Sequence, residues 1–153
     1  MRVNFLVDNL GGTQLSYHLI HECNAAVRTG VASVVVFYNE LNQHSLTPLF
    51  PTMHMVEVWG QLGVGIATSL NTANALISVP GCSPKFFYVW DLEWLREPQR
   101  MYGVISDLLT HEDLTLIARC KTHADVIQNS FNIEVKYTVE DFNMVEMIKC
   151  VKN

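Results

Sequence analysis

Two acidic residues directly after a strongly apolar stretch are the side chains best placed in the sequence to do chemistry. Asp91 and Glu93 follow the run KFFYVW at residues 85–90. A carboxylate at the end of a buried strand can orient a hydroxyl group or act as a general base. Because the acids are two residues apart, they point to opposite sides of an extended chain, so we do not expect a catalytic pair. Helix capping or solvation of a loop is the competing interpretation for both residues.

Aromatic and hydroxyl side chains at two predicted strand ends indicate a surface for a ligand that carries hydroxyl groups. Trp90 and Trp94 can stack on the apolar face of such a ligand, and packing in the core or under a lid is the alternative. Thr68 and Ser69 follow the apolar stretch GVGIA and can bond ligand hydroxyls, although such residues more commonly cap helices. We predict that these residues form a ligand-binding set beside the two acids.

The opening stretch MRVNFLVDNLGGTQ predicts an anion site at the start of a helix. A short apolar run leads to Gly11 and Gly12, and an amphipathic pattern begins after Thr13 and Gln14. A glycine turn lets a ligand approach the backbone, and N–H groups at a helix N-terminus attract phosphate. A turn that only redirects the chain between strand and helix is the alternative. We call residues 11–14 the glycine loop.

Metal and covalent chemistry have little support in the sequence. His18, His21 and Glu22 share one side of the first predicted helix, but a metal would need a further ligand from elsewhere. The cysteines are widely spaced, which indicates reduced and partly buried thiols: Cys23, Cys82, Cys120 and Cys150. The chain holds no motif typical of zinc proteases, P-loop proteins or serine hydrolases. We therefore predict no metal site and no resident cofactor.

Apolar runs of strand length alternate with helical patterns along the whole chain. The predicted strands are residues 3–7, 32–38, 53–59, 63–69 (with its turn), 85–90, 114–118 and 134–139. Continuously apolar runs such as ASVVVFY are typical of strands buried on both faces of a parallel sheet. The sequence therefore predicts the α/β class, as a single Rossmann-like domain with a mostly parallel sheet and helices on both faces. We predict that Asp141 caps the last helix, with Phe142, Val145, Ile148 and Val151 facing the core.

Size and charge limit the classes of partner. The 153 residues, of which 49% are hydrophobic, suit one domain with a packed core. The net charge of −5 and the lack of a Lys/Arg cluster argue against nucleic acid as a partner. The longest apolar runs have strand length, so we expect no membrane span. The N-terminus lacks a signal-peptide pattern, which favours a cytoplasmic location.

Three segments share the pattern of one enzyme family. They are the glycine loop, the stretch GIATSLNTA at residues 65–73 and the stretch KFFYVWDLE at residues 85–93. The stretch LIARC at residues 116–120 stands where that family has a strand ending in serine before a helix. Together these segments resemble the N-terminal half of GT-B glycosyltransferases, especially the retaining enzymes of glycosyltransferase family 4, in which glutamine usually stands in place of Trp90. The resemblance covers nearly the whole chain.

The resemblance implies the acceptor-holding domain of an enzyme that has two Rossmann-like domains. In such enzymes the glycine loop faces the phosphates of the sugar donor, which would assign phosphate binding to residues 11–14. Asp91 or Glu93 would meet the acceptor hydroxyl, and the ligand-binding set would contact the rest of the acceptor. We expect residues 1–153 to form this single acceptor-side domain, with the donor-binding C-terminal domain absent.

Two functions of different class follow from these observations. The first is one half of a split enzyme that transfers a hexose from a nucleotide-diphosphate sugar, a co-substrate, with a separate donor-binding subunit or a second copy completing the cleft. The second is a non-catalytic Rossmann-like module that binds a protein partner in a larger assembly, for which the low charged fraction of 16% is suitable. A flavodoxin-like protein would have the same order of elements, but nothing in the sequence calls for flavin.

Overall fold

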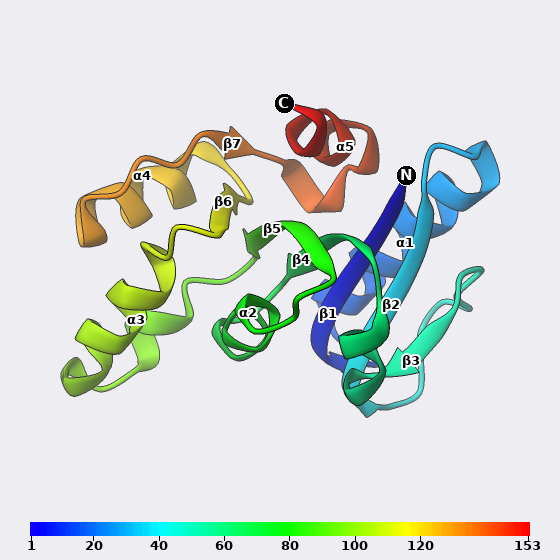
Figure 1. Ribbon diagram of the computed structural model, residues 1–153, viewed down its shortest axis with the longest axis horizontal. Coiled ribbons are helices and arrows are strands. Elements are labelled where there is room, and N and C mark those ends of the chain that lie inside the picture. The colour runs from blue at the N-terminus through cyan, green and yellow to red at the C-terminus, as the bar shows by residue number, and fades with distance from the viewer.

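The computed structural model describes residues 1–153 and contains one seven-stranded sheet, in the order β3-β2-β1-β4-β5-β6-β7 (Figure 1). The strands are β1 (Arg2–Leu10), β2 (Ser33–Leu41), β3 (Thr52–His54), β4 (Gly63–Ala67), β5 (Cys82–Val89), β6 (Leu114–Ala118) and β7 (Tyr137–Thr138). The helices are α1 (Gln14–Thr29), α2 (Leu70–Ile77), α3 (Tyr102–Leu109), α4 (Lys121–Phe131) and α5 (Met144–Lys152). Every pair of neighbouring strands is parallel, so the predicted Rossmann-like α/β class is confirmed, with a sheet that is wholly rather than mostly parallel.

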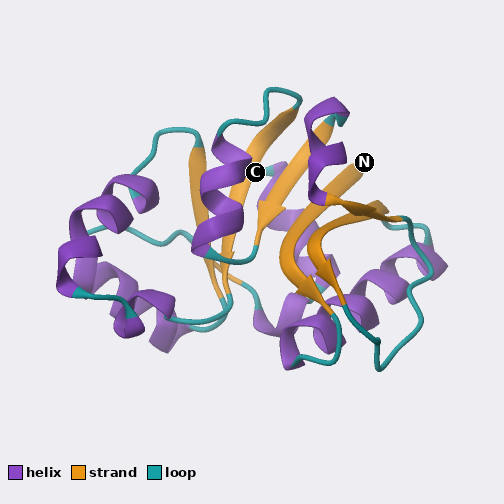
Figure 2. Cartoon of the chain, turned by 90° about the horizontal axis from the view of Figure 1, so that it is seen from below, coloured by secondary structure: helices purple, strands orange, loops and turns teal.

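Helices cover both faces of the sheet. Helices α1 and α5 lie on one face, and α2, α3 and α4 lie on the other (Figure 1, Figure 2). Side chains alternate along each strand, so Phe5 of β1 enters the core under α1 and α5, and the next residue, Leu6, enters the opposite core. Two hydrophobic cores therefore hold the central strands, and the predicted placement of helices on both faces is confirmed.

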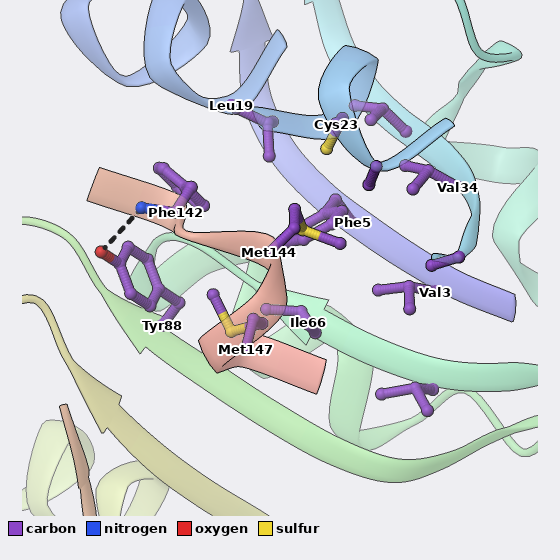
Figure 3. Close-up of a cluster of buried hydrophobic side chains, with 14 of the residues drawn as sticks. Val3, Phe5, Leu19, Cys23, Val34, Ile66, Tyr88, Phe142, Met144 and Met147 are labelled. Carbon is purple, nitrogen blue, oxygen red and sulfur yellow. Dashed lines mark hydrogen bonds between the residues drawn. The ribbon is translucent and has the colours of Figure 1, made fainter. Parts of the chain in front are cut away.

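Tyr88 of β5 joins the sheet to the segment before α5. Its ring lies in the core that Figure 3 shows, together with Val3, Phe5, Leu19, Cys23, Ile66, Met144 and Met147. Its hydroxyl donates to the carbonyl of Val139 at 2.6 Å and accepts from the N–H of Phe142 at 3.3 Å. Burial raises the pKa of Tyr88 far above its ordinary value, so the hydroxyl keeps the proton that it donates. This side chain thus satisfies two backbone groups inside the core.

Residues 53–59 do not form the predicted strand. Strand β3 ends at His54, and a 3₁₀-helix follows at Met55–Gly60. The buried side chains of this turn are Met55 and Val58, three residues apart, which is the period of a 3₁₀-helix. The strand at this place is therefore only three residues long, Thr52–His54.

The C-terminal segment also differs from the predictions. The strand predicted at residues 134–139 is reduced to the two residues of β7. Asp141 does not cap the last helix, since it has a φ of 42° and binds Arg119 instead. Asn143 is the cap, and its Oδ1 accepts from two backbone N–H groups at 3.1 and 3.2 Å. Because α5 starts only after this cap, Val145 is 55% exposed and does not face the core.

Candidate functional site

Strands β1 and β4 are neighbours in the sheet, but the chain leaves them toward opposite faces. Helix α1 follows β1 on one face, and α2 follows β4 on the other. Such a switch point opens a crevice at the carboxyl ends of the strands, where α/β proteins bind ligands. The glycine loop follows β1, residues 68–71 follow β4, and residues 90–93 follow β5. The topology therefore brings the three segments with candidate residues to one edge of the sheet.

Two carboxylates lie at the polar centre of this edge, Asp8 in β1 and Glu93 in the turn after β5. The Oδ1 of Asp8 accepts from the amide nitrogen of Asn71 at 2.7 Å, and the Oε1 of Glu93 accepts from the N–H of Leu70 at 3.1 Å. Burial raises the pKa of Glu93 to about 7, and the negative charges of Asp8 and Asp91 act in the same direction. A carboxyl group with a pKa near neutrality both takes up and releases a proton, which suits a general base.

Asp91 and Glu93 have separate partners, although they are close in sequence. A 3₁₀-turn at Glu93–Arg96 follows β5 directly and places the Glu93 carboxyl at the N-terminus of α2. Asp91 stays outside this turn, 56% exposed, and forms an ion pair with Arg96. Glu93 is therefore the better candidate for proton transfer, while Asp91 fits the solvated, salt-bridged alternative.

The hydroxyl groups of Thr68 and Ser69 are used within the protein. Thr68 is 3% exposed, and its hydroxyl donates to the carbonyl of Leu6 at 2.9 Å. Ser69 is 8% exposed and shares a capping box with Thr72, in which each side chain accepts from the other residue's N–H. The Ser69 bonds correspond to the capping alternative, whereas the Thr68 hydroxyl ties the end of β4 to β1. The exposed polar side chain next to this strand end is Asn71.

Both tryptophans are packed against other side chains. Trp90 is 8% exposed and stacks on Phe142, with the ring centres 5.2 Å apart. The guanidinium of Arg119 lies 3.8 Å from the centre of the Trp90 ring. Trp94 is half-buried, and the ring of Phe131 meets it edge-on at 5.2 Å. Packing, rather than an open ring face for a ligand, is the arrangement that this geometry supports.

The glycine loop is partly closed and partly open. The N–H of Gly11 is buried and donates to the Ser16 hydroxyl at 3.2 Å. A Cβ at Gly11 would lie 2.7 Å from the Cβ of Asn42, so this position requires glycine for close packing. Thr13 caps α1 by accepting from the N–H of Ser16 at 3.1 Å. Residues 12–14 are exposed, and the first turn of α1 carries no acidic residue, so an anion would meet this part of the loop.

A groove of about 600 Å³ leads away from the crevice between α2 and α3. Asn71 and Glu93 line the end of the groove that is nearest the carboxyl ends of the strands. His111, which follows α3, also lines the groove. The volume lies within the range of pockets that hold small molecules. The crevice and the groove thus share Asn71 and Glu93 as their polar boundary.

Two residues at the carboxyl ends of the strands were not predicted from the sequence as part of the site. Asp8 interrupts the first apolar run immediately before the glycine loop, and an acid at the end of a buried strand is the available signal for it. Arg119 directly follows β6 and has no distinguishing local pattern. Its role depends on Asp141, which it contacts at 2.8 Å, and on the ring of Trp90.

The structure holds no group of three or more His, Cys, Asp or Glu side chains arranged for a metal ion. His21 instead pairs with the adjacent Glu22 at 3.0 Å, and the side chain of His18 lies against Trp90 with ring centres 5.5 Å apart.

None of the helices combines the length and the apolar character that crossing a membrane requires.

Comparison of the chain with protein-family models, with curated proteins and with solved structures finds no match. The fold assignment therefore rests on the strand order and register described above. The candidate site rests on the contacts of Asp8, Asn71 and Glu93, and on the switch point that brings them together.

Proposed function

We propose that the protein is an acceptor-side domain of a glycosyltransferase, and that an acceptor hydroxyl binds in the crevice between β1 and β4. The observation that carries this proposal is Glu93, whose carboxyl lies at the switch-point edge with a pKa raised to about 7. A base with this pKa can take the proton of a hydroxyl near neutral pH. The resemblance of residues 65–73 and 85–93 to glycosyltransferase segments supports the same function.

In the proposed transfer, each polar group at the edge has a distinct role. The acceptor oxygen forms a bond to the anomeric carbon of the donor sugar as the bond from that carbon to the diphosphate breaks. Glu93 takes the proton of the acceptor hydroxyl, and the diphosphate leaves with its negative charge near the exposed residues 12–14, where α1 begins. Asn71, held by Asp8, orients a further acceptor hydroxyl. A donor-binding subunit or a second copy of the chain would supply the remaining side of the cleft.

Titration of ¹⁵N-labelled protein, followed by amide chemical shifts, tests the donor and acceptor sides separately. We expect UDP-glucose and GDP-mannose to shift the amides of residues 12–14, and simple hexoses and disaccharides to shift those of Leu70 and Asn71. Glu93→Gln keeps an oxygen for the Leu70 N–H, so sugar binding should persist while any transfer activity is lost. Glu112→Gln, in the exposed turn before β6, is the matched control. The absence of shifts at both places with every compound tested would overturn the proposal.

A second candidate function is a non-catalytic module in a larger assembly. The observation in its favour is a set of exposed apolar side chains in and after the 3₁₀-turn that follows β3: Val56 (64%), Trp59 (54%) and Leu62 (72%). Exposed apolar side chains that lie close together are typical of protein contacts. Analytical ultracentrifugation of the wild type and a Trp59→Ser variant tests this function. A monomeric wild type that saturates with a nucleotide-sugar would favour the transferase instead.

A further inference from the structure

The groove between α2 and α3 has an apolar floor that runs along both helices. On the α3 side apolar residues recur three or four positions apart, at Met101, Val104, Ile105 and Leu108. On α2 the apolar residues are Leu70 and Ile77, two turns apart, with Asn71 and Asn74 between them. From residue 70 to residue 77 a helix rises about 10 Å, which sets the length of the floor. Both walls begin near the carboxyl edge of the sheet and run toward its opposite edge (Figure 1).

The charged side chains that line this groove have one sign, and Lys85, a cation at the end of α2, is held by the carbonyl of Ile77. Three carboxylates line the groove, Glu93 and Glu97 before α3 and Asp107 within it, and no lysine or arginine belongs to the lining. Arg96, the nearby cation in the same segment, is engaged by Asp91. The Nδ1 atom of His111 accepts from the N–H of Asp113 at 3.2 Å.

An apolar floor with carboxylates toward both ends complements a linear aliphatic chain that carries protonated amines. The methylene groups of such a chain cover apolar side chains, and its amines meet the acids. The volume of about 600 Å³ suits a small ligand. A peptide helix on a floor of this length would have only about two turns, too few for an isolated helix to be stable.

We propose that the groove between α2 and α3 is a binding site for a linear aliphatic polyamine, which lies on the apolar floor with amines at Glu97 and Asp107. This site adjoins that of the proposed function and shares Asn71 and Glu93 with it, but Glu97 and Asp107 take no part in the proposed transfer. The half-buried carboxyl of Glu93, whose pKa is about 7, adds negative charge at the end of the groove nearest the sheet edge only at higher pH.

Spermidine is the probe for this proposal, with 1,8-octanediol as an uncharged chain and octanoate as a chain of opposite charge. In amide chemical-shift titrations we expect spermidine to shift Ile77 and Leu108 in a saturable manner, and the other two compounds to leave them unchanged. Glu97→Gln and Asp107→Asn should each weaken spermidine binding about threefold, because each removes one exposed ion pair. Asp125→Asn, an exposed acid on α4 outside the groove, should leave the affinity unchanged.

Three results would overturn the polyamine site. Equal weakening by Asp125→Asn would show attraction to the overall negative charge only. Equal binding of octanediol would make the groove a site for uncharged apolar chains. Shifts of Ile77 and Leu108 with a basic amphipathic peptide but not with spermidine would make it a protein-docking groove. Retained nucleotide-sugar shifts at residues 12–14, which lie outside the groove, would leave the proposed function standing in each case.

Discussion

Replacing Glu93 with glutamine should stabilise the protein above pH 7, and the gain should disappear near pH 4. The carboxyl group has a pKa of about 7 in the folded protein, against an ordinary value of 4.5. Between these values the folded state binds more protons than the unfolded state, so the free energy of unfolding falls as the pH rises through this window. Glutamine removes the charge and keeps an oxygen that accepts the N–H of Leu70.

The size of the gain follows from the same two pKa values. The difference between 4.5 and about 7 sets an upper limit of about 3 kcal/mol, since each pH unit corresponds to about 1.4 kcal/mol. The carboxyl is only half-buried, and screening by solvent reduces the effect to about 1–2 kcal/mol. For a chain of this size, that corresponds to a rise of about 3–6 °C in the Tm at pH 8.

Urea unfolding of the wild type and of Glu93→Gln at pH 4, 6, 7 and 8 measures the difference directly. Glu112→Gln is the control, because this exposed carboxylate in the turn before β6 should give nearly parallel curves. A gain for Glu93→Gln that is the same at pH 4 and pH 8 would refute the reasoning. So would a midpoint near 4.5 in a ¹³C NMR titration of the Glu93 carboxyl, because the folded and unfolded values would then coincide.

Three further substitutions test the contacts around the site, each by urea unfolding. Tyr88→Phe should lower the free energy of unfolding by about 1–3 kcal/mol, because two buried backbone groups of residues 139–142 lose their hydrogen-bond partner. An unchanged free energy of unfolding would show that the two bonds do not stabilise the protein. Gly11→Ala should cost about 1–3 kcal/mol and shift the amide of Asn42, since the new Cβ meets that residue; no shift there would contradict the close packing. Ser69→Ala should cost about 1 kcal/mol and speed amide exchange in the first turn of α2, and exchange at the wild-type rate would argue against its capping role.

The fold class could be predicted because the strands are buried on both faces. The continuous apolar runs at residues 32–38 and 85–90 have no polar face, which a parallel sheet between two layers of helices requires. This signal is local, so it is present in the sequence before any contact is known. Short edge strands such as β3 and β7 lack it, since they contain few buried side chains, and their limits were therefore predicted poorly.

The position of the candidate residues at strand ends was predictable from the sequence, but their contacts were not. Sequence spacing puts Thr68, Ser69 and Trp90 at strand ends, yet it does not tell whether a ligand or the protein satisfies them. The partner of Thr68 is the carbonyl of Leu6, 62 residues away, and such a pairing exists only once β1 and β4 are side by side. The pKa of Glu93 likewise depends on burial and on Asp8, a residue of a distant strand. Distant contacts of this kind have no local signature.

The central position of β1 has a consequence for how the chain acquires its structure during synthesis. Val3 of β1 pairs with Val64 of β4, so one side of β1 has no partner until about sixty further residues have followed. At ordinary rates of translation this delay lasts about 3–12 s. Throughout it, the emerging chain presents an apolar strand with a free hydrogen-bonding edge, the kind of surface that favours aggregation and recruits chaperones. We therefore expect the yield of folded protein on overexpression to depend on chaperone supply and temperature more than on substitutions at the carboxyl ends of the strands.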